Sequence, residues 1–198
     1  MLQPTNLDAK SDQELYLLFL KNDNEAFNTL VKKYRKLLIA FIIKYVKNIE
    51  IAEDLAQDTF VYMLINKKEY DFKYTFKTYL YTIAKSRAIN YLKKEKKIII
   101  FDESYMLDND IEFYEENLDA TLIKKENYEI LYKNLKRLKQ DYKLAIYLAD
   151  FQGFKYKEIS RILNKTLPQT KMLIHRARKA LEKSLKKEEN LCWVKKIL

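Results

Sequence analysis

Residues 156–181 carry the residue types and spacing that could bind duplex DNA. Their first half places three apolar side chains on one face of a short helix: Ile159, Ile162 and Leu163. Asn164 then suits a turn, because asparagine tolerates the left-handed backbone in which helices often end. Thr166 is a good N-cap for the next helix, and Pro168 falls in its first turn, where a missing N–H costs nothing. This pattern is typical of a helix-turn-helix.

The second helix of the pair carries cations on one side. Three residues at four-residue steps are expected to face the core: Leu173, Ala177 and Leu181. A second stripe contains Gln169, Met172 and Arg176, with His175 and Lys179 beside it. Such a stripe can enter a major groove, where Arg and Gln side chains reach base edges. The alternative is an ordinary helical hairpin whose basic face is solvated.

The charge of the chain is unevenly distributed. The 198 residues have a formal net charge of +10, but no Lys or Arg occurs between Lys97 and Lys124. That gap holds eight acidic residues: Asp102, Glu103, Asp108, Asp110, Glu112, Glu115, Glu116 and Asp119. Two basic blocks separated by an acidic strip predict two polyanion-binding domains joined by a linker.

The composition favours an all-α protein. One Gly and two Pro argue against a β-rich fold, which needs many tight turns. Helices are expected over about 12–20, 24–46, 49–66, 76–97, 122–138 and 141–151, in addition to the helix-turn-helix. Ser11 with Glu14 forms a capping box, Asp23 or Asn24 caps the second helix, and Gly153 is expected to adopt a left-handed conformation.

Several function classes are disfavoured by the sequence. A lone cysteine, Cys192, excludes a disulfide framework and argues against a cysteine zinc site. The longest apolar run, 37–43, is too short to span a membrane, and no signal peptide is evident, so we expect a cytoplasmic protein without membrane insertion. There is no glycine-rich phosphate loop, no nucleophile paired with a base and no metal-ligand cluster. We therefore expect a protein that is not an enzyme and needs no cofactor or metal.

Two further surfaces stand out in the first half. Asp54, Gln57 and Asp58 form a polar patch on one helix, which could dock a partner, although spacing alone favours a solvated face. Residues 67–97 hold ten basic and three acidic residues, interleaved with aromatic ones: Tyr70, Phe72, Tyr74 and Tyr79. Cations and aromatic rings suit single-stranded nucleic acid, although core packing is the simpler interpretation of each ring.

Taken together, these segments resemble the extracytoplasmic-function sigma factors, the small bacterial initiation subunits of RNA polymerase. The resemblance covers about residues 12–185 and rests on four stretches in the family's order: 25–34, 51–64, 76–94 and 138–181. It implies two small helical domains, region 2 over 1–97 and region 4 over 122–198, with an acidic linker over 98–121. The linker would run through the polymerase near the RNA path.

The resemblance also implies site residues. Those expected to meet core RNA polymerase are Asp54, Leu55, Gln57, Asp58 and Phe60. Those expected at the −10 promoter element are Tyr70, Phe72, Lys85, Ser86, Asn90, Lys93 and Lys94, with a flipped base held by the connection 66–75. Those expected at the −35 element are Thr166, Gln169, Lys171, Met172, His175, Arg176, Arg178 and Lys179, the residues Arg178 and Lys179 reaching phosphates rather than bases.

The departures from the family leave the promoter sequence open. Tyr79 stands where the family usually has Trp, Ser86 where it commonly has Asn, and Asn90 where Asp is frequent. In the helix-turn-helix, Asn164 replaces Gly, and Lys165 and Thr170 occupy positions that are usually apolar.

The implied function is an alternative sigma factor that docks on core polymerase, recognises promoter DNA and melts it without a cofactor. An anti-sigma factor that clamps between the two domains is the implied further partner. One alternative is a stand-alone helix-turn-helix regulator that binds duplex DNA without polymerase. Another is a basic protein that coats RNA or a membrane surface, with no sequence preference and a steep salt dependence. Neither alternative needs the acidic segment or the patch in 51–64.

Overall fold

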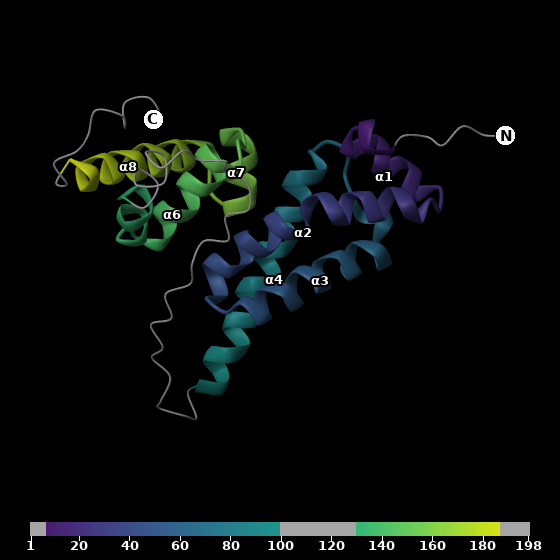
Figure 1. Cartoon of the computed structure of the whole chain (residues 1–198), viewed down its shortest axis with the longest axis horizontal. Helices are drawn as coiled ribbons and strands as arrows, with labels where there is room; N and C mark the ends of the chain where they lie inside the picture. The colour runs from purple at the N-terminus through teal and green to yellow at the C-terminus, as the bar shows by residue number, and fades with distance from the viewer. Residues whose placement is uncertain (1–6, 100–129, 187–198) are drawn as a thin grey trace. The chain divides into compact units, whose positions relative to one another are not determined.

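The computed structural model describes residues 7–99 and 130–186, and all regular structure in these ranges is helical (Figure 1). The predicted all-α class is therefore confirmed. The chain divides into two units, residues 1–114 and 115–198, each with its own packed interior. The acidic segment 98–121 lies outside the described residues except for the backbone of its first two, so its role as a linker stays a prediction.

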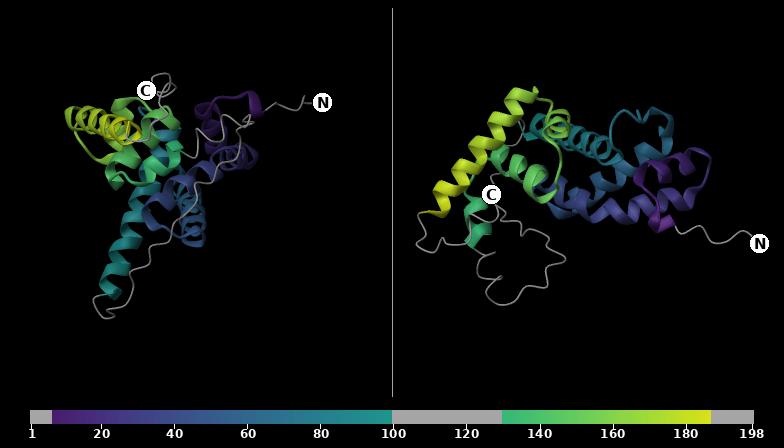
Figure 2. Two further views of the ribbon diagram at one scale, coloured as in Figure 1. Left: turned by 60° about the vertical axis from the view of Figure 1, so that its left-hand side comes forward. Right: turned by 90° about the horizontal axis from the view of Figure 1, so that it is seen from above.

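The described part of the first unit, residues 7–99, consists of four α-helices and two short 3-10 helices. Its elements are η1 (Leu7–Ala9), α1 (Asp12–Leu20), α2 (Asn24–Val46), α3 (Ile49–Ile65), η2 (Lys67–Glu69) and α4 (Phe76–Ile99). The long helices α2, α3 and α4 pack against one another, and α1 packs on α2 and α4 (Figures 1 and 2). The four helices agree with the expected ranges to within two residues at each end.

Short polar side chains set where these helices begin. Ser11 forms the predicted capping box with Glu14, and Asp23 accepts a hydrogen bond from the Ala26 amide at 3.2 Å. Asn48 caps α3 by accepting from the Ile51 amide at 3.0 Å. Each cap satisfies an amide that the helix itself leaves unpaired, so these three boundaries follow from residues within one turn.

Aliphatic side chains from three helices fill the core of the first unit. Those buried most completely include Leu30, Leu38 and Ile42 of α2, Ala56 and Met63 of α3, and Leu80 and Ala84 of α4. Fully burying one large apolar side chain contributes about 1.5–3 kcal/mol. Burial of one apolar face on each helix therefore holds α3 and α4 in place and fixes which of their faces remain exposed.

The second unit contains a described helical segment over 130–136, then α6 (Gln140–Ile146), η3 (Tyr147–Phe151), α7 (Tyr156–Leu163) and α8 (Leu167–Leu185). The sequence predicts one helix over 141–151, but the structure breaks it into an α-helix and a π-helical turn. In that turn the Gln152 amide donates to the Tyr147 carbonyl, five residues back, at 2.9 Å. Gly153 then adopts φ +66°, the left-handed conformation expected of it.

The helix α8 packs against both α6 and α7, and this packing corrects one expectation. The residues of α8 that enter the core are Thr170, Ile174, Ala177, Leu181 and Leu185, whereas Leu173 is only half-buried. The core stripe therefore starts at Thr170 and Ile174 and not at Leu173. The opposite side of α8 is left exposed.

Candidate nucleic-acid interface

The joint between α7 and α8 is a tight turn made by local chemistry. Asn164 ends α7 in the left-handed region, with φ 54° and ψ 51°. The Thr166 hydroxyl accepts from the Gln169 amide at 3.3 Å, and the Gln169 side-chain oxygen accepts from the Thr166 amide at 2.9 Å. Pro168 occupies the first turn of α8, where it removes no hydrogen bond. Turn, cap and proline all lie where the sequence predicts them.

Replacing Thr166 with Ala is expected to destabilise the second unit by about 1 kcal/mol, because the Gln169 amide in the first turn of α8 loses the hydroxyl that accepts its hydrogen bond. Thr166→Ser keeps the hydroxyl and is expected to retain most of the stability. Thermal unfolding of the full chain, followed by circular dichroism, measures both. Equal melting temperatures for the Ala and Ser variants would contradict the role of the cap.

The exposed face of α8 carries most of the residues predicted for duplex DNA. Its exposed side chains include Gln169, Lys171, Met172, His175, Arg176 and Lys179. Met172 stands in the middle of this face with 50% of its surface exposed. A large apolar side chain at such a position can contact the methyl group of thymine, and an adjacent arginine can donate to guanine.

Two of the predicted DNA contacts are already engaged within the protein. The side-chain oxygen of Gln169 accepts from Thr166, so its NH₂ group is the part that remains to donate. The guanidinium of Arg178 hydrogen-bonds to Asp150 and to the Tyr156 hydroxyl and is only half-exposed. The surface of α8 that is available to DNA is therefore smaller than the eight residues expected at the −35 element.

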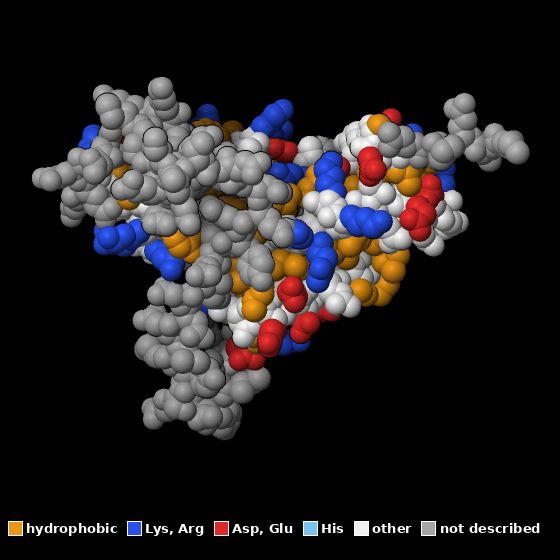
Figure 3. Space-filling model, in the orientation of Figure 1, with side chains coloured by type: hydrophobic (Ala, Val, Ile, Leu, Met, Phe, Trp, Pro, Cys, Tyr) orange, Lys and Arg blue, Asp and Glu red, His pale blue; other side chains and the backbone are white. Residues whose placement is uncertain are grey.

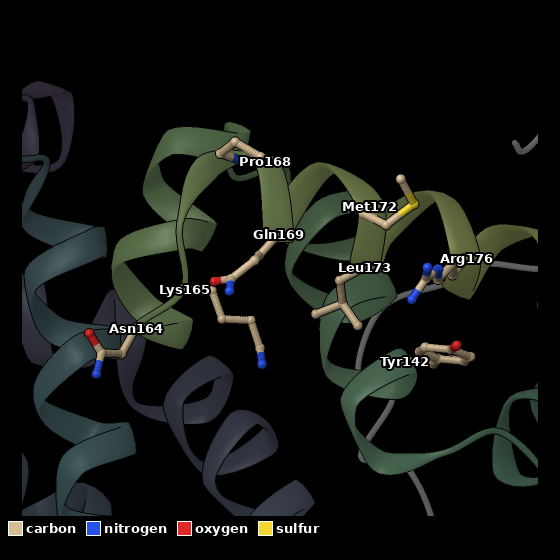
Figure 4. Close-up of a pocket in the computed structure, with 8 residues that line it drawn as sticks. All are labelled: Tyr142, Asn164, Lys165, Pro168, Gln169, Met172, Leu173 and Arg176. Atoms are coloured by element: carbon tan, nitrogen blue, oxygen red, sulfur yellow. The ribbon is translucent and has the colours of Figure 1, made fainter.

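A groove of about 670 Å³ runs beside this face. Its lining comes from α6, the turn and α8: Tyr142, Asn164, Lys165, Pro168, Gln169, Met172, Leu173 and Arg176. Figure 4 shows Gln169 reaching toward Lys165 at one end, Arg176 near Tyr142 at the other, and Leu173 pointing into the recess between the two ends. Lys165 pairs with Asp141 of α6 at 3.8 Å. The candidate base-reading residues thus form one wall of a recess that has a polar end.

A second polar face lies on α4. Ser86, Asn90, Lys93 and Lys94 are exposed on one side of the helix, and Lys85 beside them is half-buried. The opposite side is anchored by Leu80, Ala84 and Ala88, which are fully buried. The spacing of four, three and one residues keeps the exposed group within one face of a helix. The structure therefore brings these five predicted −10 residues together.

The connection between α3 and α4 is held by aromatic packing. Tyr70 is only 5% exposed, lies 4.7 Å from Tyr16 between ring centroids, and donates its hydroxyl to the Tyr74 carbonyl at 2.7 Å. Its ring is therefore part of the core and does not present a stacking surface. Phe72 is exposed, with its ring edge packed near Tyr16 at 6.2 Å. Of the two predicted aromatic contacts, only Phe72 is placed to meet a nucleic acid.

Tyr79, the residue in the position that is usually Trp, lies under this connection. Its ring is 5.2 Å from that of Tyr70, and its hydroxyl is buried without a hydrogen-bond partner among the described residues. Burial raises the pKa of Tyr79 to about 12. The tyrosine at this position therefore leaves one buried polar atom without a hydrogen-bond partner among the described residues.

The polar patch on α3 is exposed as predicted, but two of the five residues expected to meet the polymerase are not. Asp54, Gln57 and Asp58 are exposed, whereas Leu55 lies in the core and Phe60, 6% exposed, packs edge-on against Phe27 at 6.4 Å. Leu55 and Phe60 therefore support the helix from beneath and do not form its outer surface. The correction follows from helical geometry, because positions 55 and 60 lie on the core side of α3.

The exposed apolar part of this face consists of Val61, Leu64 and Ile65. Ile65 is 73% exposed, the largest value among the large apolar side chains of the described residues. Figure 3 shows acidic side chains over the N-terminal half of α3 and hydrophobic ones toward its C-terminal end. The stripe from Asp54 through Gln57 and Val61 to Ile65 repeats at three and four residues, so helical periodicity in the sequence could have predicted it. We call the following six residues the α3 face: Asp54, Gln57, Asp58, Val61, Leu64 and Ile65.

Arg87 connects the α3 face to α4. Its guanidinium lies 3.8 Å from the Asp58 carboxylate and 5.1 Å from the centre of the Tyr62 ring. Its Nε atom is buried and has no hydrogen-bond partner among the described residues. Sequence reasoning missed Arg87, because its partners lie 25 and 29 residues away.

Family models match both halves of the chain. The model for sigma-70 region 2 matches residues 30–98, and the model for sigma-70 region 4 matches residues 128–181, together more than half of the chain. The chain belongs to the sigma-70 family. The resemblance drawn from the sequence is thereby confirmed, including its division into a region 2 and a region 4.

Curated relatives place this sigma factor in the extracytoplasmic-function group. It is 26% identical to the RNA polymerase sigma-H factor of Pseudomonas aeruginosa over 187 residues, which are 90% of this chain and 96% of that protein. It is also 26% identical to the ECF RNA polymerase sigma factor SigW of Bacillus subtilis over 172 residues, 84% of this chain and 92% of that protein. The match thus extends over nearly the whole length of both relatives.

A solved structure shares the fold of this sigma factor. It is the sigma factor RpoE of Bartonella quintana in complex with the anti-sigma factor NepR, with a TM-score of 0.66 and 21% identity. The match covers 82% of this chain and 98% of that one.

Within residues 7–99 and 130–186, no helix is long and apolar enough to span a bilayer.

Proposed function

We propose that this sigma factor binds core RNA polymerase through the α3 face, reads the −35 element with α8 and engages the melted −10 element with α4. The observation that carries the proposal is a combination of three exposed helix faces: an acidic and apolar face on α3, and polar, basic faces on α4 and α8. Each of these helices buries its opposite side in the core of its own unit. A stand-alone regulator uses duplex-binding residues only. Such a regulator would not account for the exposed acidic and apolar residues of the α3 face.

Each face has a chemistry that fits its proposed partner. Carboxylates on α3 can pair with cations of the polymerase, while Val61, Leu64 and Ile65 supply apolar area that loses water on docking. The lysines of α4 suit the phosphates of a separated strand, and exposed Phe72 provides a ring on which an unpaired base can stack. On α8, Arg176 and Met172 suit base edges, and Lys171 and Lys179 suit phosphates.

In this proposal the chain has no catalytic step of its own. Binding to the polymerase and capture of an extruded base supply the free energy that melting requires, which is a few kcal/mol per base. The sigma factor would act in the cytoplasm, where polymerase and chromosome are found. By analogy with the solved sigma–anti-sigma complex, we also propose an anti-sigma factor as its regulator.

Run-off transcription tests the proposal directly. Purified chain is combined with bacterial core polymerase and genomic DNA fragments, and the 5′ ends of the transcripts are mapped. We expect transcripts that need both proteins and that share sequence at two elements upstream of their start sites. A chain that never associates with core polymerase, but binds specific duplex DNA alone, would favour the stand-alone regulator.

A further inference from the structure

Arg178 stands at the edge of the exposed face of α8, between that face and the core. At 3.6 residues per turn it is roughly 120° around the helix from Met172. Exposed Lys179 is the next residue, and buried Ala177 is the one before. This position allows the Arg178 side chain to reach the neighbouring elements of the same unit.

All three nitrogen atoms of the Arg178 guanidinium have partners in those elements. Nε donates to one carboxylate oxygen of Asp150 at 3.3 Å, Nη2 donates to the other, and Nη1 donates to the Tyr156 hydroxyl at 3.3 Å. The paired contact with Asp150 has the fork geometry that makes arginine–carboxylate pairs directional as well as strong. The Asp150 hydrogen bond raises the pKa of Arg178, so the guanidinium remains charged.

The π-helical turn brings Asp150 to this position. The turn inserts an extra residue between Tyr147 and the end of the element, while Tyr147 and Leu148 remain buried. The Phe154 amide closes the turn by donating to the Leu148 carbonyl at 3.0 Å. Such turns interrupt an α-helix at an energetic cost and are found frequently at functional sites. Here the altered turn aims a carboxylate at α8, 28 residues later in the chain.

We propose that Arg178 is a positioning residue for α8: through Asp150 and Tyr156 it fixes the tilt of the helix, and it does not itself contact DNA. The inference rests on the proposed reading of the −35 element by α8. It moves Arg178 out of the group of residues expected at phosphates.

The position of Arg178 explains how its contacts with Asp150 and Tyr156, which we call the Arg178 brace, affect base reading. Gln169 and Met172 lie nine and six residues before Arg178, roughly 14 and 9 Å along the helix axis. Functional side chains must be held within about 0.5 Å and 10–20° of their productive geometry. A small change of tilt at Arg178 is therefore enough to move the reading end of α8 out of register.

Charge reversal tests the brace in the full chain bound to core polymerase. The variants are Arg178→Asp, Asp150→Arg and the double variant, measured on the promoter duplex recovered by run-off transcription. Each single reversal is expected to lower promoter affinity by about tenfold, because it sets two like charges against each other. The double variant is expected to regain wild-type affinity to within about threefold, since the pair is restored in the opposite sense.

Lys179→Asp is the comparison, because it makes the same charge change one residue away on the exposed face. We expect it to lose affinity that Asp150→Arg does not restore. It should also make the negative slope of log affinity against log salt shallower by about 1, as removal of a phosphate contact does. If Arg178→Asp behaves in this way, with no recovery in the double variant, Arg178 binds DNA and the brace is wrong.

Arg178→Lys provides a test that does not depend on tolerance of a reversed charge. Lysine keeps the positive charge but cannot make the forked contact with Asp150. The brace predicts lower promoter affinity with an unchanged salt slope, whereas a phosphate contact predicts nearly wild-type affinity. A wild-type chain that starts no transcription with core polymerase would overturn the proposed function. A transcribing chain that Arg178→Lys leaves unaffected would overturn the brace alone.

Discussion

An Asp54→Arg variant is expected to bind core RNA polymerase about 100-fold more weakly than the wild-type chain, because like charges brought together in an interface cost several kcal/mol. Asp54 is exposed at the N-terminal end of the α3 face and makes no contribution to the buried core. The substitution should therefore leave the melting temperature nearly unchanged. Binding of labelled chain to core polymerase, measured by fluorescence anisotropy, gives the affinity directly.

The control for Asp54→Arg is Asp8→Arg, which makes the same charge change on η1, away from the α3 face. It is expected to keep wild-type affinity for the polymerase. Ile65→Asp tests the apolar end of the same face, where the side chain is 73% exposed in the free chain. If polymerase binding survives both Asp54→Arg and Ile65→Asp, the α3 face is not the docking surface.

Arg176→Ala is expected to cost about 1–3 kcal/mol of affinity at the cognate promoter, the range for a bidentate contact with a guanine. Arg176 is exposed on α8 beside Met172 and forms part of the groove wall. The loss should be confined to duplexes that carry the recognised base pair, because a base contact is lost only where that base is present. Affinities for a set of −35 duplexes, each changed at one base pair, measure this selectivity.

Arg137→Ala is the matched control for Arg176→Ala, since Arg137 is an exposed arginine of the same unit outside α8. We expect it to leave the selectivity among duplexes unchanged. An equal loss on every duplex after Arg176→Ala would identify a phosphate contact instead. The identity of the base pair whose change abolishes the effect would assign the position that Arg176 reads.

Local features of the fold could be predicted because their causes lie within one helical turn. The Ser11–Glu14 box, the Asp23 and Thr166 caps and the left-handed Asn164 each depend on a side chain and the backbone beside it. Hydrophobic periodicity likewise gave the four helices of the first unit, because a helix repeats its faces every 3.6 residues. The order of four motifs pointed to the family.

The exposure of individual aromatic residues could not be predicted in the same way. Tyr70 and Phe72 have similar composition around them, yet Tyr70 is buried among Tyr16, Phe76 and Tyr79 while Phe72 is exposed. Each depends on which neighbouring helix covers it, and that information is spread over distant parts of the chain.

The sequence by itself determined the helical class, the boundaries of the four helices of the first unit, the turn of the helix-turn-helix and the family, because near neighbours and regular spacing decide all of these. Only the tertiary structure decided that Asp58 meets Arg87, that Tyr70 is buried while Phe72 is exposed, and that Arg178 meets Asp150. These contacts join residues 28 or 29 positions apart, or depend on helices packed from elsewhere in the chain. Spacing along one helix shows which side chains share a face, but packing between helices decides which of those faces are left for a partner.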